Sequence, residues 1–228
     1  MLMIGGGDNN NQAISPPTDL AIQFSVTTNS VVAELGMVPN QPLTFATDSK
    51  PRWEDALIAY TWDKFFKTGD SRWPARMAMT KSATAAMTAI QRLLAEEDVT
   101  IKDFFVAGAS KRGWTTWTTA AVDDRVRAIA PIVIDLLNIE PSFEHHWRVY
   151  GFWSPAIQDY VDMSTTDWWR SAESHALFDL VAPLSYRDRY TMPKLILNAA
   201  GDEFFVPTSS QFYYDKLPDE KYLRYVPN

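Results

Sequence analysis

The amino-acid sequence predicts an α/β fold, in which helices cover both faces of a mostly parallel β-sheet. Three short apolar runs, at residues 104–107, 128–134 and 193–199, are typical of strands buried in a parallel sheet. Segments with helical spacing of apolar residues separate them. The 228 residues show no internal repeat and suffice for one sizeable core, so we expect a single domain over residues 1–228.

The first half of the chain is loop-rich before it becomes helical. Pro74 suits the first turn of a helix, and the apolar positions after it recur at helical spacing as far as an acidic run. The expected elements are, in order, the end of a strand at 1–4, strands near 21–26 and 31–35, and helices at 53–66 and from 74 to the acidic run at 96–98.

The second half alternates strands and helices more clearly. Pro131 is awkward in the run 128–134, because proline cannot donate to a central ladder. The expected elements are strands at 104–107, 128–134, 193–199 and 221–226, and helices at 114–122 and 209–217. Helix 114–122 carries Trp114 and Trp117 on one face, which we expect to pack on the sheet.

Residues 138–185 form an aromatic-rich segment without a clear strand. We expect a helical insertion that caps the carboxyl ends of the strands, where ligands bind in such sheets. Some of its tryptophans are expected to line a pocket; the candidates are Trp147, Trp153, Trp168 and Trp169.

Composition excludes several kinds of site. The net charge is −7 and no basic stripe suggests nucleic acid. No apolar run is long enough for a membrane span, and the short start at residues 1–4 is no signal peptide. The chain has no cysteine, which excludes disulfides, thiol nucleophiles and thiolate metal sites. We expect no cofactor and no metal.

Residues 108–113, GASKRG, provide the strongest functional signal. A serine among small residues, between a strand and a helix, is typical of a nucleophile on a tight, strained turn. The turn would expose the Ser110 hydroxyl and place the Lys111 N–H at a helix start, where it can stabilise an oxyanion. The spacing departs from G-x-S-x-G, because the second glycine follows the serine by three residues.

A second oxyanion donor is expected from the loop Gly5, Gly6 and Gly7, which follows the first strand. Glycines let backbone N–H groups approach a ligand closely. The alternative is a flexible N-terminal segment. The Lys111 and Arg112 side chains can aid an oxyanion or hold a substrate carboxylate. They can instead pair with Asp123, Asp124 or Glu140.

Two aspartates follow strand ends and compete for the role of triad acid. Asp202 comes after strand 193–199 through a glycine turn and takes the acid position in the order serine, acid, histidine. Asp135 follows strand 128–134 and is the second candidate. Asp202 can also be a turn or helix-cap residue.

The base histidine is absent from its expected place. No histidine follows Glu203, and the loop after strand 221–226 would begin at Pro227 and Asn228, the last residues. We expect a fragment that lacks the first strands of the fold and its C-terminal end. His145, His146 and His175 are expected to be structural or surface residues, and the adjacent pair lacks the spacing of a zinc site.

Six runs of the sequence carry a resemblance to a known family: IGGG at 4–7, YTWD at 60–63, WPARMAMTK at 73–81, AGASKRGWTTWTTAAVDDRV at 107–126, YGFWS at 150–154 and GDEFF at 201–205. Over almost its whole length, the chain resembles the PhoPQ-activated pathogenicity-related protein family. The resemblance implies an α/β-hydrolase-like fold and an exported, secreted or periplasmic protein. It also implies a Pro-Asn-x-x-His segment after the last strand, of which the sequence holds Pro227 and Asn228.

These observations favour a serine hydrolase. Ser110 would attack an ester or amide carbonyl of a small-molecule, glycan or peptide substrate, and Asp202 would orient a histidine beyond residue 228. The backbone N–H of Lys111 and the loop at residues 5–7 would bind the oxyanion. The alternative is a secreted binding or signalling protein on the same scaffold, without catalysis.

Overall fold

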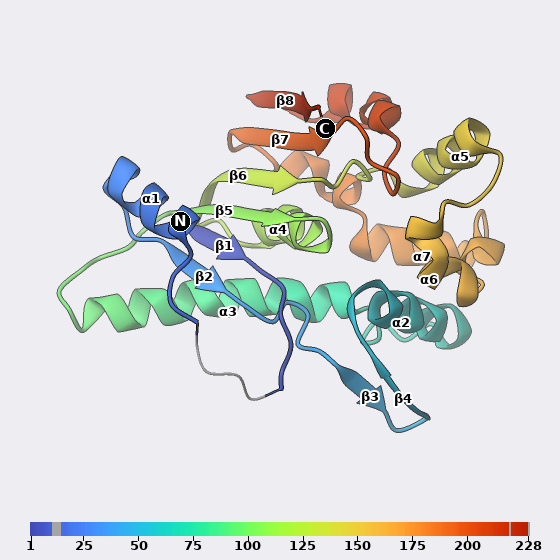
Figure 1. Ribbon diagram of the computed structural model, residues 1–228, viewed down its shortest axis with the longest axis horizontal. Coiled ribbons are helices and arrows are strands. Elements are labelled where there is room, and N and C mark those ends of the chain that lie inside the picture. The colour runs from blue at the N-terminus through green and yellow to red at the C-terminus, as the bar shows by residue number, and fades with distance from the viewer. Residues whose placement is uncertain (11–14, 219, 228) are drawn as a thin grey trace.

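A six-stranded, fully parallel sheet forms the centre of the computed structural model, which describes residues 1–10, 15–218 and 220–227 (Figure 1). The strands lie in the order β2-β1-β5-β6-β7-β8, with every neighbouring pair parallel. A separate antiparallel hairpin joins β3 and β4. The strands are β1 (Leu2–Ile4), β2 (Ala33–Leu35), β3 (Leu43–Phe45), β4 (Asp48–Arg52), β5 (Phe104–Ala109), β6 (Val126–Ile132), β7 (Lys194–Ala199) and β8 (Lys221–Val226).

Four helices precede the second half of the sheet: α1 (Asp19–Thr28), α2 (Glu54–Thr68), α3 (Ala75–Ala95) and α4 (Lys111–Val122). Helix α4 packs against β5, β6 and α3 and lies at the centre of the core. Its Trp114 and Trp117 are buried, as the pattern on the helix predicts. The sheet with its flanking helices confirms the predicted fold class.

Residues 21–26 form part of helix α1, and the predicted strand there is wrong. The Thr18 side chain caps the helix by accepting the Ala21 N–H, and Asn29 ends it in the left-handed conformation. A strand at these residues would place alternate side chains on one face. On the helix, however, Leu20, Ile22 and Val26 are exposed, so the capping signals are the better guide here.

Between β6 and β7, the insertion (residues 138–185) is helical, with α5 (Ile139–Tyr150), α6 (Gln158–Asp162), α7 (Ala172–Val181) and 3₁₀ turns between them. Helices α6 and α7 pack on α2. In Figure 1, α5, α6 and α7 lie beyond the arrowheads of β5 and β6, at the carboxyl ends of the strands. This is the edge of the sheet at which Ser110 follows β5.

Pro131 interrupts the ladder between β6 and β7. The Ile129 N–H donates to the Pro193 carbonyl and the Val133 N–H donates to the Leu197 carbonyl. Pro131 lies between these two donors and has no N–H to give. The strands nevertheless pair on either side of it, so the proline is accommodated in a central strand.

Residues 207–216 form two short 3₁₀ helices, Pro207–Phe212 and Tyr214–Lys216, in place of the predicted α-helix at 209–217. Their N–H groups donate to carbonyls three residues earlier, as from Ser209 to Val206 and from Tyr213 to Ser210. Tyr213, with φ −142°, separates the two segments. This compact connection brings the chain from the loop after β7 into β8.

Candidate active site

Ser110 occupies the tight turn between β5 and α4 with φ 55° and ψ −125°. Its N–H donates to the Ile132 carbonyl of β6 across 2.8 Å, and its carbonyl accepts the Trp114 N–H of α4 at 3.0 Å. A serine rarely adopts a positive φ, and such strain costs about 1–3 kcal/mol. The unusual backbone geometry expected for this residue is therefore present, fixed by hydrogen bonds on both sides.

The glycines beside Ser110 allow the backbone to approach itself closely. A Cβ on Gly108 would lie 2.7 Å from the Arg112 carbonyl oxygen. On Gly113, it would lie 2.9 Å from the Ile132 carbonyl oxygen and 3.0 Å from that of Gly108. The second glycine thus serves the packing of α4 on the sheet, which explains why it follows the serine by three residues.

Ser110 borders a narrow, almost completely filled pocket of about 10 Å³, which we call the serine pocket. Three charged residues line it: Asp55, Arg76 and Lys111. The rest of the wall is apolar or aromatic and consists of Trp62, Trp114, Ile134, Leu136, Phe143, Tyr160, Phe204 and Phe205. The insertion contributes Phe143 and Tyr160, so it encloses the serine from above the sheet edge.

Lys111 is buried, and its ammonium lies between two carboxylates of helix α2. The Nζ atom is 2.9 Å from Glu54 and 2.8 Å from Asp55. Behind it, Arg76 of α3 donates to the Lys111 carbonyl at 3.1 Å and lies 3.9 Å above the Trp114 ring. The Lys111 side chain is thus ion-paired with Glu54 and Asp55. The partners expected from the sequence were Asp123, Asp124 or Glu140.

Arg112 connects helix α4 to the glycine loop. Its guanidinium donates to both Glu54 oxygens, at 2.6 and 2.8 Å, and its Nε donates to the Val38 carbonyl at 2.5 Å. Burial disfavours the Glu54 carboxylate, but hydrogen bonds from Arg112, Lys111 and Gln41 outweigh it and lower the pKa of Glu54 to about 2. Glu54 is therefore an anion at neutral pH.

The glycine loop is fixed by this network and by strand β2. Gln41 donates to the Gly7 carbonyl at 2.9 Å and to Glu54 at 2.6 Å. A Cβ on Gly6 would lie 2.8 Å from an Arg112 nitrogen. The Gly5 N–H donates to the Leu35 carbonyl at 2.8 Å. Gly5 thus extends the sheet, while Gly6 and Gly7 form the loop beside α4.

Asp202 lies in the loop after β7, and its Oδ1 accepts the N–H groups of Phe204 and Phe205 at 2.8 and 2.9 Å. Burial raises its pKa, and the two backbone hydrogen bonds oppose that rise. Because both phenylalanines line the serine pocket, the Asp202 loop borders the pocket directly.

Asp135 is more deeply buried, just after β6. Tyr225 of β8 donates to its Oδ2 at 2.5 Å. Burial raises the pKa of Asp135 to about 6; the tyrosine hydrogen bonds oppose this and the nearby Asp202 charge adds to it. The preceding Val133 has φ 43°, unusual for a β-branched residue.

The three histidines have partners away from Ser110. His146 is buried and accepts the Ser154 N–H at 3.0 Å. His145 contacts the Thr208 hydroxyl at 2.6 Å, and His175 lies 3.0 Å from Glu140. None of the three lines the serine pocket among the described residues. In the same residues, no group of three or more His, Asp or Glu side chains is arranged to hold a metal ion.

The profile of the PhoPQ-activated pathogenicity-related protein family matches residues 1–228. The chain belongs to this family. Autocrine proliferation repressor protein A from Dictyostelium discoideum is 41% identical over 231 residues, which cover 100% of this chain and 47% of that protein. This PhoPQ-related chain therefore spans about half the length of the curated relative that it matches.

Solved structures similar to the PhoPQ-related chain show its fold. Acetyl xylan esterase 1 from a Thermoanaerobacterium species has a TM-score of 0.62 and 15% identity, with 100% of this chain and 68% of that chain covered. An acetyl xylan esterase from a Paenibacillus species has a TM-score of 0.60 and 13% identity, with 98% and 66% covered. The chain has the α/β-hydrolase fold. Within the described residues, no helix is both long and apolar enough to cross a membrane.

Four residues of the site were missed from the sequence: Glu54, Asp55, Arg76 and Tyr160. Arg76 stands inside the family-like run at residues 73–81, which was its one available signal. Glu54 and Asp55 look like ordinary acidic residues at a helix start. Only the packing of α2 beside α4 reveals that they hold the residue after the serine.

Proposed function

We propose that this chain carries the nucleophile and the acid of a serine hydrolase that acts on esters. The observation that carries the proposal is the strained backbone of Ser110 at the start of α4, beside an enclosed pocket. In this scheme, the Ser110 hydroxyl attacks the ester carbonyl and gives its proton to a histidine. The histidine passes that proton to the leaving alcohol, and water then releases the acid from the serine by the same steps.

The oxyanion would be bound by backbone N–H groups. The first is that of Lys111, at the positive end of the α4 dipole. The Lys111 ammonium is held by two carboxylates, which favours the backbone over the side chain for this role. Since the Gly5 N–H donates to Leu35, Gly6 and Gly7 are the better candidates for the second donor.

Asp202 is the better acid of the two candidates. Both of its backbone hydrogen bonds use Oδ1, which leaves Oδ2 to accept from an imidazole N–H. Asp135 already accepts a short hydrogen bond from Tyr225 and is almost fully buried. The base would be a histidine beyond residue 228, because the histidines of this chain have other partners.

The substrate would carry a small acyl group, because the serine pocket is nearly filled and the side chains around it would have to move further for a large one. Amides are a less favoured second class. The acetyl xylan esterases with the same fold support ester chemistry by analogy of fold. The family match supports a place of action outside the cytoplasm, secreted or periplasmic.

A second function, as a secreted regulatory protein without catalysis, is favoured by one observation. The relative with 41% identity is named a proliferation repressor. On this alternative, the Ser110 turn would be a feature of the scaffold, and the serine pocket would serve binding.

The test compares this chain with one extended past residue 228 by its own coding sequence. We expect the extended protein to react with a fluorophosphonate and to hydrolyse p-nitrophenyl acetate, and the 228-residue chain to be nearly inactive. Ser110→Ala and Asp202→Asn should each lower kcat of the extended protein by roughly a thousandfold or more. Ser49→Ala, at an exposed serine, is the matched control.

Two outcomes would contradict the proposal. An extended protein that neither labels nor turns over any ester supports the regulatory alternative. If the 228-residue chain is as fast as the extended one, the base lies within it, and His145, His146 and His175 must be replaced one at a time.

A further inference from the structure

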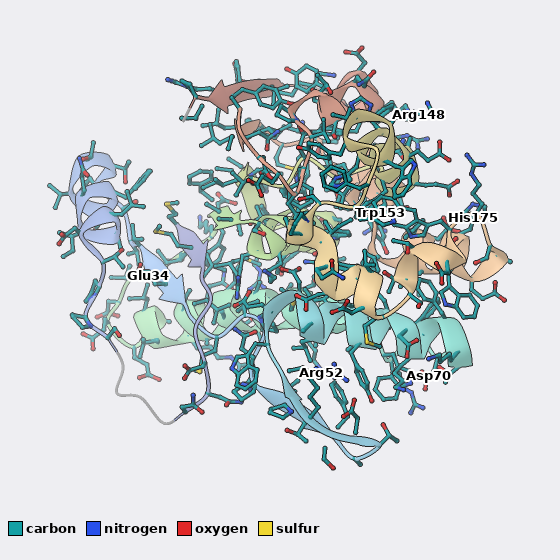
Figure 2. The ribbon with its side chains drawn as sticks, turned by 45° about the vertical axis from the view of Figure 1, so that its right-hand side comes forward. Glu34, Arg52, Asp70, Arg148, Trp153 and His175 are labelled. Atoms are coloured by element: carbon teal, nitrogen blue, oxygen red, sulfur yellow. The ribbon has the colours of Figure 1, made fainter. Side chains whose placement is uncertain are left out.

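Three tryptophans of the insertion line an open hollow of about 350 Å³ that lies outside the serine pocket; we call it the tryptophan groove. They are Trp147, whose side chain is 47% exposed, with Trp153 and Trp169. Figure 2 labels Arg148 and Trp153, both at the part of the molecule that holds the helical insertion. Pockets for small ligands usually measure roughly 300–1,000 Å³, so the groove has the size of a binding site.

The rim of the tryptophan groove is charged but balanced. Glu140 and Glu144 of α5 line it together with Arg148 and Arg170, so two carboxylates face two guanidinium groups. Arg170 Nε donates to Glu144 at 2.9 Å, and Arg148 lies 3.6 Å from the same carboxylate. Guanidinium donors and carboxylate acceptors therefore lie side by side on the rim, and their four charges sum to zero.

This arrangement argues against two kinds of ligand. An ammonium ligand needs aromatic rings that surround a gap, whereas here Trp153 lies 4.9 Å from Trp147 and 5.1 Å from Trp169 between ring centroids. The rings thus pack against one another at steep angles and leave no gap between them. An acyl chain or a bilayer surface would have to desolvate four charged side chains, which is costly.

We propose that the tryptophan groove binds a neutral oligosaccharide built from pyranose rings with equatorial hydroxyls. Such a ring presents flat C–H faces that can lie on the exposed Trp147 ring. Its neighbouring hydroxyls both donate and accept, which matches adjacent carboxylate and guanidinium groups that form paired hydrogen bonds. The zero net charge of the rim selects a neutral sugar over a uronate or a phosphate.

The tryptophan groove and the serine pocket have no lining residue in common, but an aromatic contact connects their walls. Phe143 lines the serine pocket, and its ring centroid is 4.5 Å from that of Trp169. A saccharide in the groove therefore lies one aromatic ring away from the pocket. We assign the bound saccharide to the part of an ester substrate that does not react. This assignment rests on the proposed function, whereas the binding of a saccharide in the groove does not.

The test measures binding in the Ser110→Ala variant, so that turnover plays no part. Xylohexaose and cellohexaose are titrated into the protein and followed by calorimetry and by tryptophan fluorescence. We expect saturable binding of at least one of them, and Trp147→Ala should weaken it by on the order of tenfold or more. Trp53→Ala is the matched control, because Trp53 is 43% exposed and lies outside the groove.

The proposal is overturned if neither hexasaccharide binds at millimolar concentration, or if Trp53→Ala weakens binding as much as Trp147→Ala. Self-association that Trp147→Ala abolishes, without any sugar binding, would show that the groove is a protein contact. If the groove binds sugar but the extended protein hydrolyses no ester, the binding inference stands and the proposed function is refuted.

Discussion

The Arg76 guanidinium donates to the Lys111 carbonyl oxygen at 3.1 Å, which ties helix α3 to the peptide that follows the serine turn. Arg76 is 3% exposed and lies over the Trp114 ring. The buried Arg76 cation helps to fix the position of the first turn of α4, which carries the Lys111 N–H. It also keeps a fixed positive charge in the wall of the serine pocket.

Replacing Arg76 by methionine should destabilise the protein. The change leaves the Lys111 carbonyl without this donor and leaves the half-buried Asp55 short of a nearby cation, so we expect a loss of about 2–4 kcal/mol in the free energy of unfolding. Urea denaturation measures it. The control, Arg72→Ala at an exposed ion pair, should leave the free energy of unfolding nearly unchanged. Equal effects would show that Arg76 has no special role.

Gly113→Ala should be costly, because its Cβ would meet the Ile132 carbonyl at 2.9 Å and the Ile134 side chain at 2.9 Å. We expect a loss of roughly 1–3 kcal/mol, as is usual for overpacking. Gly36→Ala is the control, since its Cβ would find its nearest neighbour at an ordinary 3.7 Å. Thermal unfolding of the two variants checks the difference, and a tolerated Gly113→Ala would mean that α4 is free to shift.

Asp135 should make stability fall as the pH rises between about 4 and 6. Its pKa in the folded protein is raised from 3.8 to about 6, so the folded state holds the proton more tightly than the unfolded state does. The stabilisation is complete below pH 4 and is lost as the pH passes 6, a change on the order of 3 kcal/mol.

Asp135→Asn removes this titration and keeps a group that can accept from Tyr225. Urea unfolding at pH 4, 5, 6 and 7 should show a stability difference between variant and parent that grows in favour of the variant with pH. A constant difference across these four values would mean that the Asp135 pKa is not raised.

Tyr160→Phe should loosen the insertion. The Tyr160 hydroxyl donates to Asp55 at 3.0 Å and so connects α6 to the carboxylate that also holds Lys111. Hydrogen bonds to charged groups contribute roughly 1.5–3 kcal/mol, and we expect a loss in that range by chemical denaturation. Tyr222→Phe, at an exposed tyrosine that donates to Glu220, should be nearly neutral. A neutral Tyr160→Phe would place the stability of the insertion in its apolar contacts.

The Ser110 turn could be predicted because its signals are local. A short apolar strand, two glycines and a helical run stand next to one another, and the backbone between them has few alternatives. The same local logic failed for residues 21–26, which were expected to form a strand. There the cap of Thr18 on Ala21 favours the helix, and the apolar side chains stay exposed.

The charged network could not be predicted, because it depends on contacts far apart in the sequence. Arg112 and Glu54 are 58 residues apart, and nothing in either segment specifies the other. The choice between Asp135 and Asp202 was open for a similar reason. Both follow strand ends, and only Tyr225, 90 residues from Asp135, shows that one of them already has a hydrogen-bond partner.

Pro131 removes one hydrogen bond from the seam between β6 and β7, although the two strands pair on either side of it. Strands β2, β1, β5 and β6 lie on the side of this seam that carries Ser110, whereas β7 and β8 lie on the side that carries Asp202. Because the seam lacks the bond that Pro131 cannot donate, its alignment depends more on side-chain packing than that of an unbroken ladder. The spacing between the serine hydroxyl and the Asp202 carboxylate is thus set across this seam, and amide exchange at Val133 would report how often it opens.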